Sequence, residues 1–188
     1  SLYPHRQFGI RTEYAESSHP PYRSVAGSGF VKLAPEVKER LRFLTRVVDK
    51  EIKHLEYAAD QTFGVPLVLE AVERLDANPE LAMRIEAFTS RFCRLQDTLG
   101  DKLLPVLLKA LGEPERALLI NLEKAEKYGW LESSEHWLAL RQLRNQMIHE
   151  YIENAQTLFD ALTTAYDNTD FLKDFADKLE RQTSDLLE

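Results

Sequence analysis

The residues best suited to chemistry lie in one stretch near the C-terminus, residues 141–151. Arg144 and His149 stand five residues apart in it. An imidazole titrates near neutral pH, so His149 could take a proton from a ribose 2′-hydroxyl or return one to a leaving oxygen. The planar fork of Arg144 matches two phosphate oxygens and could neutralise charge that develops at phosphorus. Together the two side chains suit cleavage of RNA without a metal ion.

The stretch belongs to a long amphipathic helix. At about 100° per residue, its apolar residues share one broad face that should be buried. These residues are Leu140, Leu143, Met147, Ile148, Ile152, Ala155, Leu158, Phe159 and Leu162. Arg144 projects from the middle of this face, where a guanidinium without a partner would be costly. We therefore expect a polar partner from a neighbouring helix, with Gln96 and Asp97 as the candidates.

Further polar side chains surround the pair. Asn145 and His149 are four residues apart and therefore adjacent on the helix, with Gln142 and Arg141 nearby. We predict that these three neighbours support the site. A purely structural interpretation stays open, in which His149 is a surface residue bonded to Asn145 and Arg144 is tied to a carboxylate of a neighbouring helix.

The sequence pattern Arg144-Asn145-x-x-x-His149-x-Tyr151 resembles the signature of the HEPN family. These small all-helical proteins include toxin ribonucleases and partners of minimal nucleotidyltransferases. Their motif is an Arg followed after four to six residues by a His, often with an Asn after the Arg and a Tyr two residues after the His. The resemblance covers roughly residues 79–162. It implies that Arg144 and His149 are catalytic and that Asn145 orients the reacting group.

The resemblance also implies a function and partners. It predicts a metal-independent endoribonuclease that is the toxin of a toxin–antitoxin pair, with no cofactor, and with RNA and an antitoxin nucleotidyltransferase as partners. In some toxins of the family the antitoxin attaches nucleotides to the motif tyrosine, which corresponds to Tyr151; a half-buried core aromatic is the alternative for this residue. The alternative function is a non-catalytic helical partner of a nucleotidyltransferase or of another protein.

A second copy of the chain is expected to complete the site. On a regular helix Arg144 and His149 point about 140° from one another, so one helix alone does not build the site. Two copies could pair their motif helices, and the resemblance implies the same, since the active cleft of the family lies between two protomers. We expect a symmetric homodimer whose contacts use apolar residues left over from the bundle.

Composition places the chain among soluble globular proteins. It has 188 residues, of which 44% are hydrophobic and 29% charged, which fits a single domain. The net charge of −7 argues against a broad surface for coating nucleic acid, but allows a local basic pocket. One cysteine, Cys93, excludes an internal disulfide and a cysteine-rich metal site. No apolar run approaches the ~20 residues of a membrane span, so we expect a cytoplasmic protein.

The expected fold is all-α, an antiparallel bundle of about five to six helices over residues 31–188, preceded by an irregular N-terminal arm at residues 1–30. Prolines, glycines and scattered aromatic residues characterise the arm. Helical periodicity, caps and breakers predict helices at residues 35–63, 67–75, 80–111 (with a kink at Pro105), 114–127, 134–166 and 170–187. Ser133 or Ser134 should cap the motif helix. Trp130 and Trp137 should anchor the core, whereas His54, Glu51 and Asp60 are expected to form a solvated face.

Overall fold

The computed structural model describes residues 32–149 and 153–188. The predicted arm at residues 1–30 lies outside this part, and so do Glu150 and Tyr151 of the motif stretch and the following Ile152. Residues Leu33–Glu188 form one compact unit. Within the described ranges the chain is helical and contains no strand, which confirms the all-α prediction. None of these helices is long and apolar enough to cross a bilayer.

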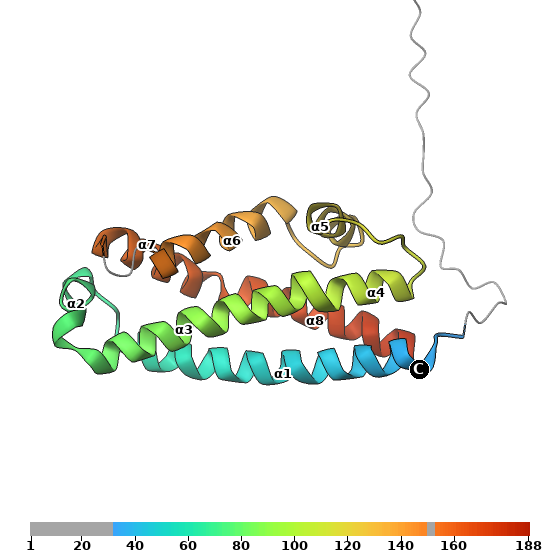
Figure 1. Ribbon diagram of the computed structural model, residues 1–188, viewed down its shortest axis with the longest axis horizontal. Helices are drawn as coiled ribbons and strands as arrows, with labels where there is room; N and C mark the ends of the chain where they lie inside the picture. Colours follow the sequence, from blue (N-terminus) through green and yellow to red (C-terminus); the bar gives the residue numbers. More distant parts are fainter. Residues whose placement is uncertain (1–31, 150–152) are drawn as a thin grey trace, which may run out of the picture. The chain divides into compact units, whose positions relative to one another are not determined.

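The helices form an antiparallel bundle (Figure 1). They are α1 Pro35–Phe63, α2 Leu69–Glu73, a 3₁₀ turn Leu75–Ala77, α3 Pro79–Asp97, a π-helical stretch Thr98–Leu103, α4 Leu104–Ala110, α5 Leu118–Lys127, α6 Ser134–His149, α7 Ala155–Asp167 and α8 Thr169–Leu187. The long helix α1 packs along α3, and α8 packs against both. Helix α6 lies against α3 and α7, and α5 against α6.

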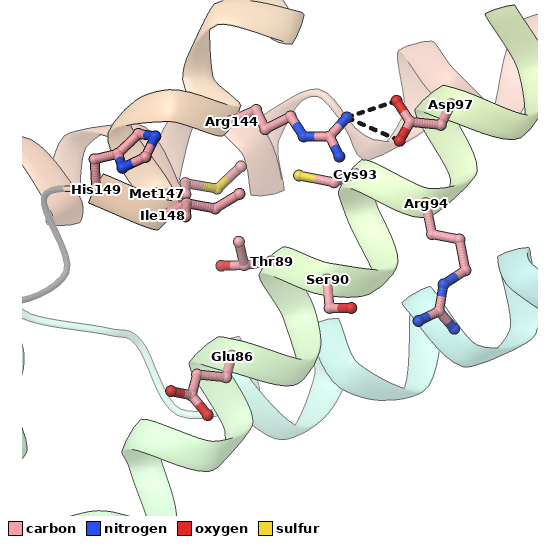
Figure 2. A pocket seen from close by; sticks show the side chains of 10 residues that line it. All are labelled: Glu86, Thr89, Ser90, Cys93, Arg94, Asp97, Arg144, Met147, Ile148 and His149. Atoms are coloured by element: carbon pink, nitrogen blue, oxygen red, sulfur yellow. Dashed lines mark hydrogen bonds and ion pairs between the residues drawn. The ribbon is translucent and has the colours of Figure 1, made fainter. Parts of the chain in front are cut away.

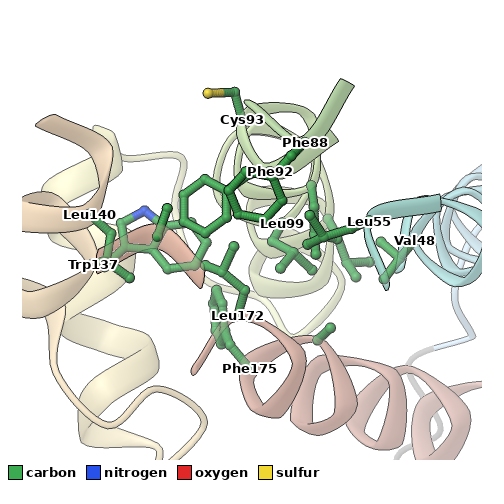
Figure 3. Close-up of a cluster of buried hydrophobic side chains, with 14 of the residues drawn as sticks. Val48, Leu55, Phe88, Phe92, Cys93, Leu99, Trp137, Leu140, Leu172 and Phe175 are labelled. Carbon is green, nitrogen blue, oxygen red and sulfur yellow. The ribbon is translucent and has the colours of Figure 1, made fainter. Parts of the chain in front are cut away.

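The core follows from the helical spacing of apolar residues. On α1, Leu41, Leu44, Val48 and Leu55 recur every three, four or seven residues and are buried. Helix α3 presents Ile85, Phe88, Phe92 and Leu95 in the same way. The ring of Trp137, fully buried, lies 5.1 Å from that of Phe175 on α8 in an edge-to-face arrangement (Figure 3). The prediction that Trp130 and Trp137 are core residues is confirmed.

The helical run from Pro79 to Ala110 contains a π-helical stretch, Thr98–Leu103, directly before the predicted kink at Pro105. A proline has no N–H to donate and its ring crowds the carbonyl four residues earlier, and a widened turn accommodates both effects. Gly100 lies in this stretch, where an added Cβ would stand 3.0 Å from Cζ2 of Trp137. The absence of a side chain at Gly100 lets Trp137 pack against the α3–α4 run.

The predicted helix at residues 114–127 begins later, at Leu118. The prediction took Pro114 as the first helical residue, which is a common position for proline. Instead Asn121 folds back, and its Nδ2 donates to the backbone carbonyl of Arg116 at 3.2 Å. This bond satisfies one carbonyl of the segment that precedes the helix.

The motif helix predicted to run to residue 166 is two helices, α6 and α7. Asn154 begins the second one, because its Oδ1 accepts a hydrogen bond from the backbone N–H of Thr157 at 3.0 Å. The apolar pattern hid this break, since Leu158 and Leu162 on α7 are buried as fully as Met147 on α6. An N-cap inside an otherwise periodic stretch was the overlooked signal.

Candidate functional site

An open cleft of about 520 Å³ lies between α3 and α6 (Figure 2). Its lining residues on α3 are Glu86, Thr89, Ser90, Cys93, Arg94 and Asp97, and those on α6 are Arg144, Met147, Ile148 and His149. Both residues that the sequence predicts to be catalytic therefore line one cleft, together with side chains of a helix that begins more than fifty residues earlier in the chain.

Local bonds fix α6 beside α3. Ser133 caps α6, as predicted, because its Oγ accepts from the backbone N–H of His136 at 3.0 Å. Gln96, one of the two expected partners of Arg144, is fully buried and its Nε2 donates to the carbonyl oxygen of Trp137 at 3.3 Å. Met147 adds a buried contact near the end of the helix. These contacts hold the backbone that carries the cleft residues.

Asp97 is the partner of Arg144. Nη1 of the guanidinium donates to Oδ1 at 2.7 Å and to Oδ2 at 2.8 Å of the carboxylate. The bond to Asp97 raises the pKa of Arg144 above its usual range. About a third of each side chain is exposed, 35% for Arg144 and 30% for Asp97. Nη1 alone makes these bonds, so Nη2 and Nε have no partner among the described residues.

His149 is exposed and ends the described part of α6. In Figure 2 the guanidinium of Arg144 is directed towards Asp97 and away from the imidazole of His149. The two groups share a cleft but do not face each other, which agrees with their separation around the helix. Within the described ranges no hydrogen bond joins His149 to Asn145. The other half of the structural interpretation is observed, because Arg144 is paired with the carboxylate of Asp97 on α3.

The predicted supporting residues lie around the cleft without lining it. Arg141 makes a second ion pair between α6 and the π-helical stretch, with Nη1 and Nη2 each 3.3 Å from Oδ2 of Asp101. Gln142 and Asn145 are exposed and are not among the lining residues. Tyr151 lies outside the described residues. Among the members of the predicted set that the structure describes, Arg144 and His149 are the two that line the cleft together.

Apart from Asp97, sequence reasoning missed the residues that α3 contributes to the cleft. Cys93 is buried, and burial raises the pKa of its thiol to about 11, so the thiol stays protonated at neutral pH and is a poor nucleophile. Arg94 is exposed and adds a second guanidinium. A signal was available, because Glu86, Ser90, Cys93 and Asp97 recur every three or four residues and so share one side of α3.

The group of His54, Glu51 and Asp60 departs from the predicted solvated face. His54 and Asp60 are exposed, but Glu51 is half-buried and accepts a hydrogen bond from Oγ1 of Thr98 at 2.9 Å. Burial is the main cause that raises the pKa of Glu51 above its usual value. In the part of the chain that the structure describes, no three His, Cys, Asp or Glu residues gather in a way that could hold a metal ion.

Comparison of the chain with protein-family models, with curated proteins and with solved structures gave no match. The resemblance to the HEPN family therefore depends on the motif residues themselves.

Proposed function

We propose that the protein is a HEPN-like, metal-independent endoribonuclease whose catalytic residues are Arg144 and His149. The observation that supports this most is their common position in an open cleft of about 520 Å³. Both side chains are accessible, and two nitrogens of the guanidinium remain available for phosphate oxygens. The cleft thus offers a titratable ring and a fixed positive fork to one strand of RNA.

The chemistry follows from these two groups. His149 removes the proton of a ribose 2′-hydroxyl, and that oxygen attacks the adjacent phosphorus. The bond from phosphorus to the 5′-oxygen breaks, the leaving oxygen takes a proton, and the products carry a 2′,3′-cyclic phosphate and a 5′-hydroxyl. Arg144 binds the non-bridging oxygens and stabilises the charge that develops on them.

A second copy of the chain supplies the second proton-transfer group that one cleft lacks. One imidazole does not act as base and acid at the same instant, and two copies of His149 divide the roles. Exposed apolar side chains beside the cleft favour such an association: Ile148 is 50% exposed, and Met83, on the same side of α3 as Ser90, is 68% exposed. By resemblance, we extend the proposal to a toxin whose antitoxin is a nucleotidyltransferase acting on Tyr151.

The second candidate is a non-catalytic binding module, a helical partner of a nucleotidyltransferase or another protein. The ion pair of Arg144 with Asp97 favours it, because that carboxylate already binds one nitrogen of the guanidinium that the nuclease reaction requires. In this case the pair serves to join α3 to α6.

Cleavage of RNA in EDTA separates the two candidates. Wild type and Gln146→Ala should give the same fragments, whereas His149→Ala should give none. Gln146 is the matched control because it is exposed on the same helix and does not line the cleft. Circular dichroism verifies that all three chains are folded. Identical fragments from wild type and His149→Ala would remove the catalytic claim.

A further inference from the structure

A second groove, of about 220 Å³, lies between α1 and α3. Its lining residues are Val47, Lys50, Glu51, His54, Arg91 and Arg94. Arg94 also lines the cleft between α3 and α6, so the two hollows meet at this residue. Figure 2 shows the side chain of Arg94 directed towards α1, on the other side of α3 from Arg144. A strand bound in the cleft would have to cross α3 beside Arg94 to reach the groove.

The groove is positive in an otherwise acidic chain. It presents three cations, Lys50, Arg91 and Arg94, against a single carboxylate, Glu51. That carboxylate is half-buried and already accepts a hydrogen bond from the hydroxyl group of Thr98. The chain as a whole carries −7, so this local excess of positive charge marks a place for an anion.

The groove is also held in place and partly apolar. Nη1 of Arg91 donates to the backbone carbonyl of His54 at 3.0 Å, which joins α3 to α1. Val47 is half-buried, and the carbon stems of the long cationic side chains add apolar surface. A volume of about 220 Å³ is below the roughly 300–1,000 Å³ of sites for drug-sized ligands, which suits one planar group better than a whole nucleotide.

We infer that this groove binds a nucleotide of the RNA strand next to the one that occupies the cleft. The base enters the groove against Val47 and the ring of His54, while Lys50 and Arg94 bind the backbone phosphates between the two hollows. Apolar surface with cations at its edge is the combination that proteins use for single strands, since every base has a stacking face. This inference rests on the proposed function, because the strand is placed by the cleft.

The test measures binding without cleavage, in the His149→Ala background. Fluorescence anisotropy follows a labelled single-stranded RNA of about eight nucleotides. Lys50→Glu and Arg94→Gln should each weaken binding by about fivefold, and each should reduce the slope of log affinity against log salt by about 0.7 or more. Lys127→Glu and Arg116→Gln are the matched controls, because both residues are exposed and line neither hollow.

The outcomes separate this inference from the proposed function. If the groove variants and their controls bind RNA with equal affinity, and only Arg144→Ala loses affinity, the groove does not bind the strand. The proposed nuclease function would be unaffected by that result. Weaker binding by the groove variants than by their controls, together with a wild-type chain that cuts no RNA, would keep the groove and remove the nuclease. Displacement of the RNA by an equal concentration of inorganic phosphate would reduce the groove to a simple anion site and overturn the strand assignment.

Discussion

Replacing Asp97 by asparagine should destabilise the protein and strengthen its binding to RNA at the same time. The carboxylate holds Nη1 of Arg144 at 2.7 and 2.8 Å and joins α3 to α6. It also competes with phosphate for the same guanidinium. Asparagine keeps the shape of the side chain but removes the charge, so the structural tie weakens while the guanidinium becomes available to an anion in the cleft.

The loss of stability can be estimated from the exposure of the two side chains, and the gain in binding from the number of phosphate contacts. The two side chains of the pair are 35% and 30% exposed, so solvent screens their attraction, and we expect the free energy of unfolding to fall by about 1 kcal/mol. One additional phosphate contact to a single strand should steepen the salt dependence by about 0.7, with affinity at low salt rising about fivefold.

Urea denaturation and fluorescence anisotropy, both in the His149→Ala background, measure these effects. Asp101→Asn is the matched control, because Asp101 pairs with Arg141 of α6 one helical turn further along the same run but lies outside the cleft. It should leave the salt dependence unchanged. If Asp97→Asn lowers stability but binds RNA with unchanged affinity and salt dependence, Arg144 is a structural tie and the second candidate function is favoured.

Two further predictions concern the bundle. Burial, with Asp49 alongside, raises the pKa of Glu180 from 4.5 to about 7, so the folded state loses stability as pH rises between these values. Glu180→Gln should therefore raise the free energy of unfolding by roughly 1 kcal/mol at pH 8, after allowance for partial exposure. At pH 4 the substitution should leave the free energy of unfolding unchanged. An equal gain at both pH values would contradict this prediction. Gly100→Ala places a Cβ 3.0 Å from Trp137 and should cost about 1–3 kcal/mol in thermal unfolding, and an unchanged melting temperature would show that Trp137 can move.

Sequence patterns predicted the helices most reliably where periodicity and caps agree. Helix α1 occupies the predicted residues because Pro35 begins it and its apolar spacing is regular to Phe63. The errors occurred where a polar side chain changed the local bonds, as with Asn121 in the first turn of α5 and Asn154 before α7. Periodicity reports which face is buried and is insensitive to such individual hydrogen bonds.

The site could be predicted only in part. The spacing of Arg144 and His149 on one helix was readable, and so was the need for a partner near residue 97. The contribution of Arg94, and its place between two hollows, depends on how α1, α3 and α6 pack. Such packing joins residues that are distant in the chain, and no local pattern records it.

The most direct test of the proposed function is single-turnover cleavage of one RNA by Arg144→Ala, His149→Ala and the double variant. Residues that act in one step are strongly non-additive, so the double variant should be no slower than the worse single variant, each being about 10²–10⁴-fold below wild type. Multiplied losses in the double variant would contradict a shared step, and undiminished cleavage by His149→Ala would contradict the nuclease assignment itself.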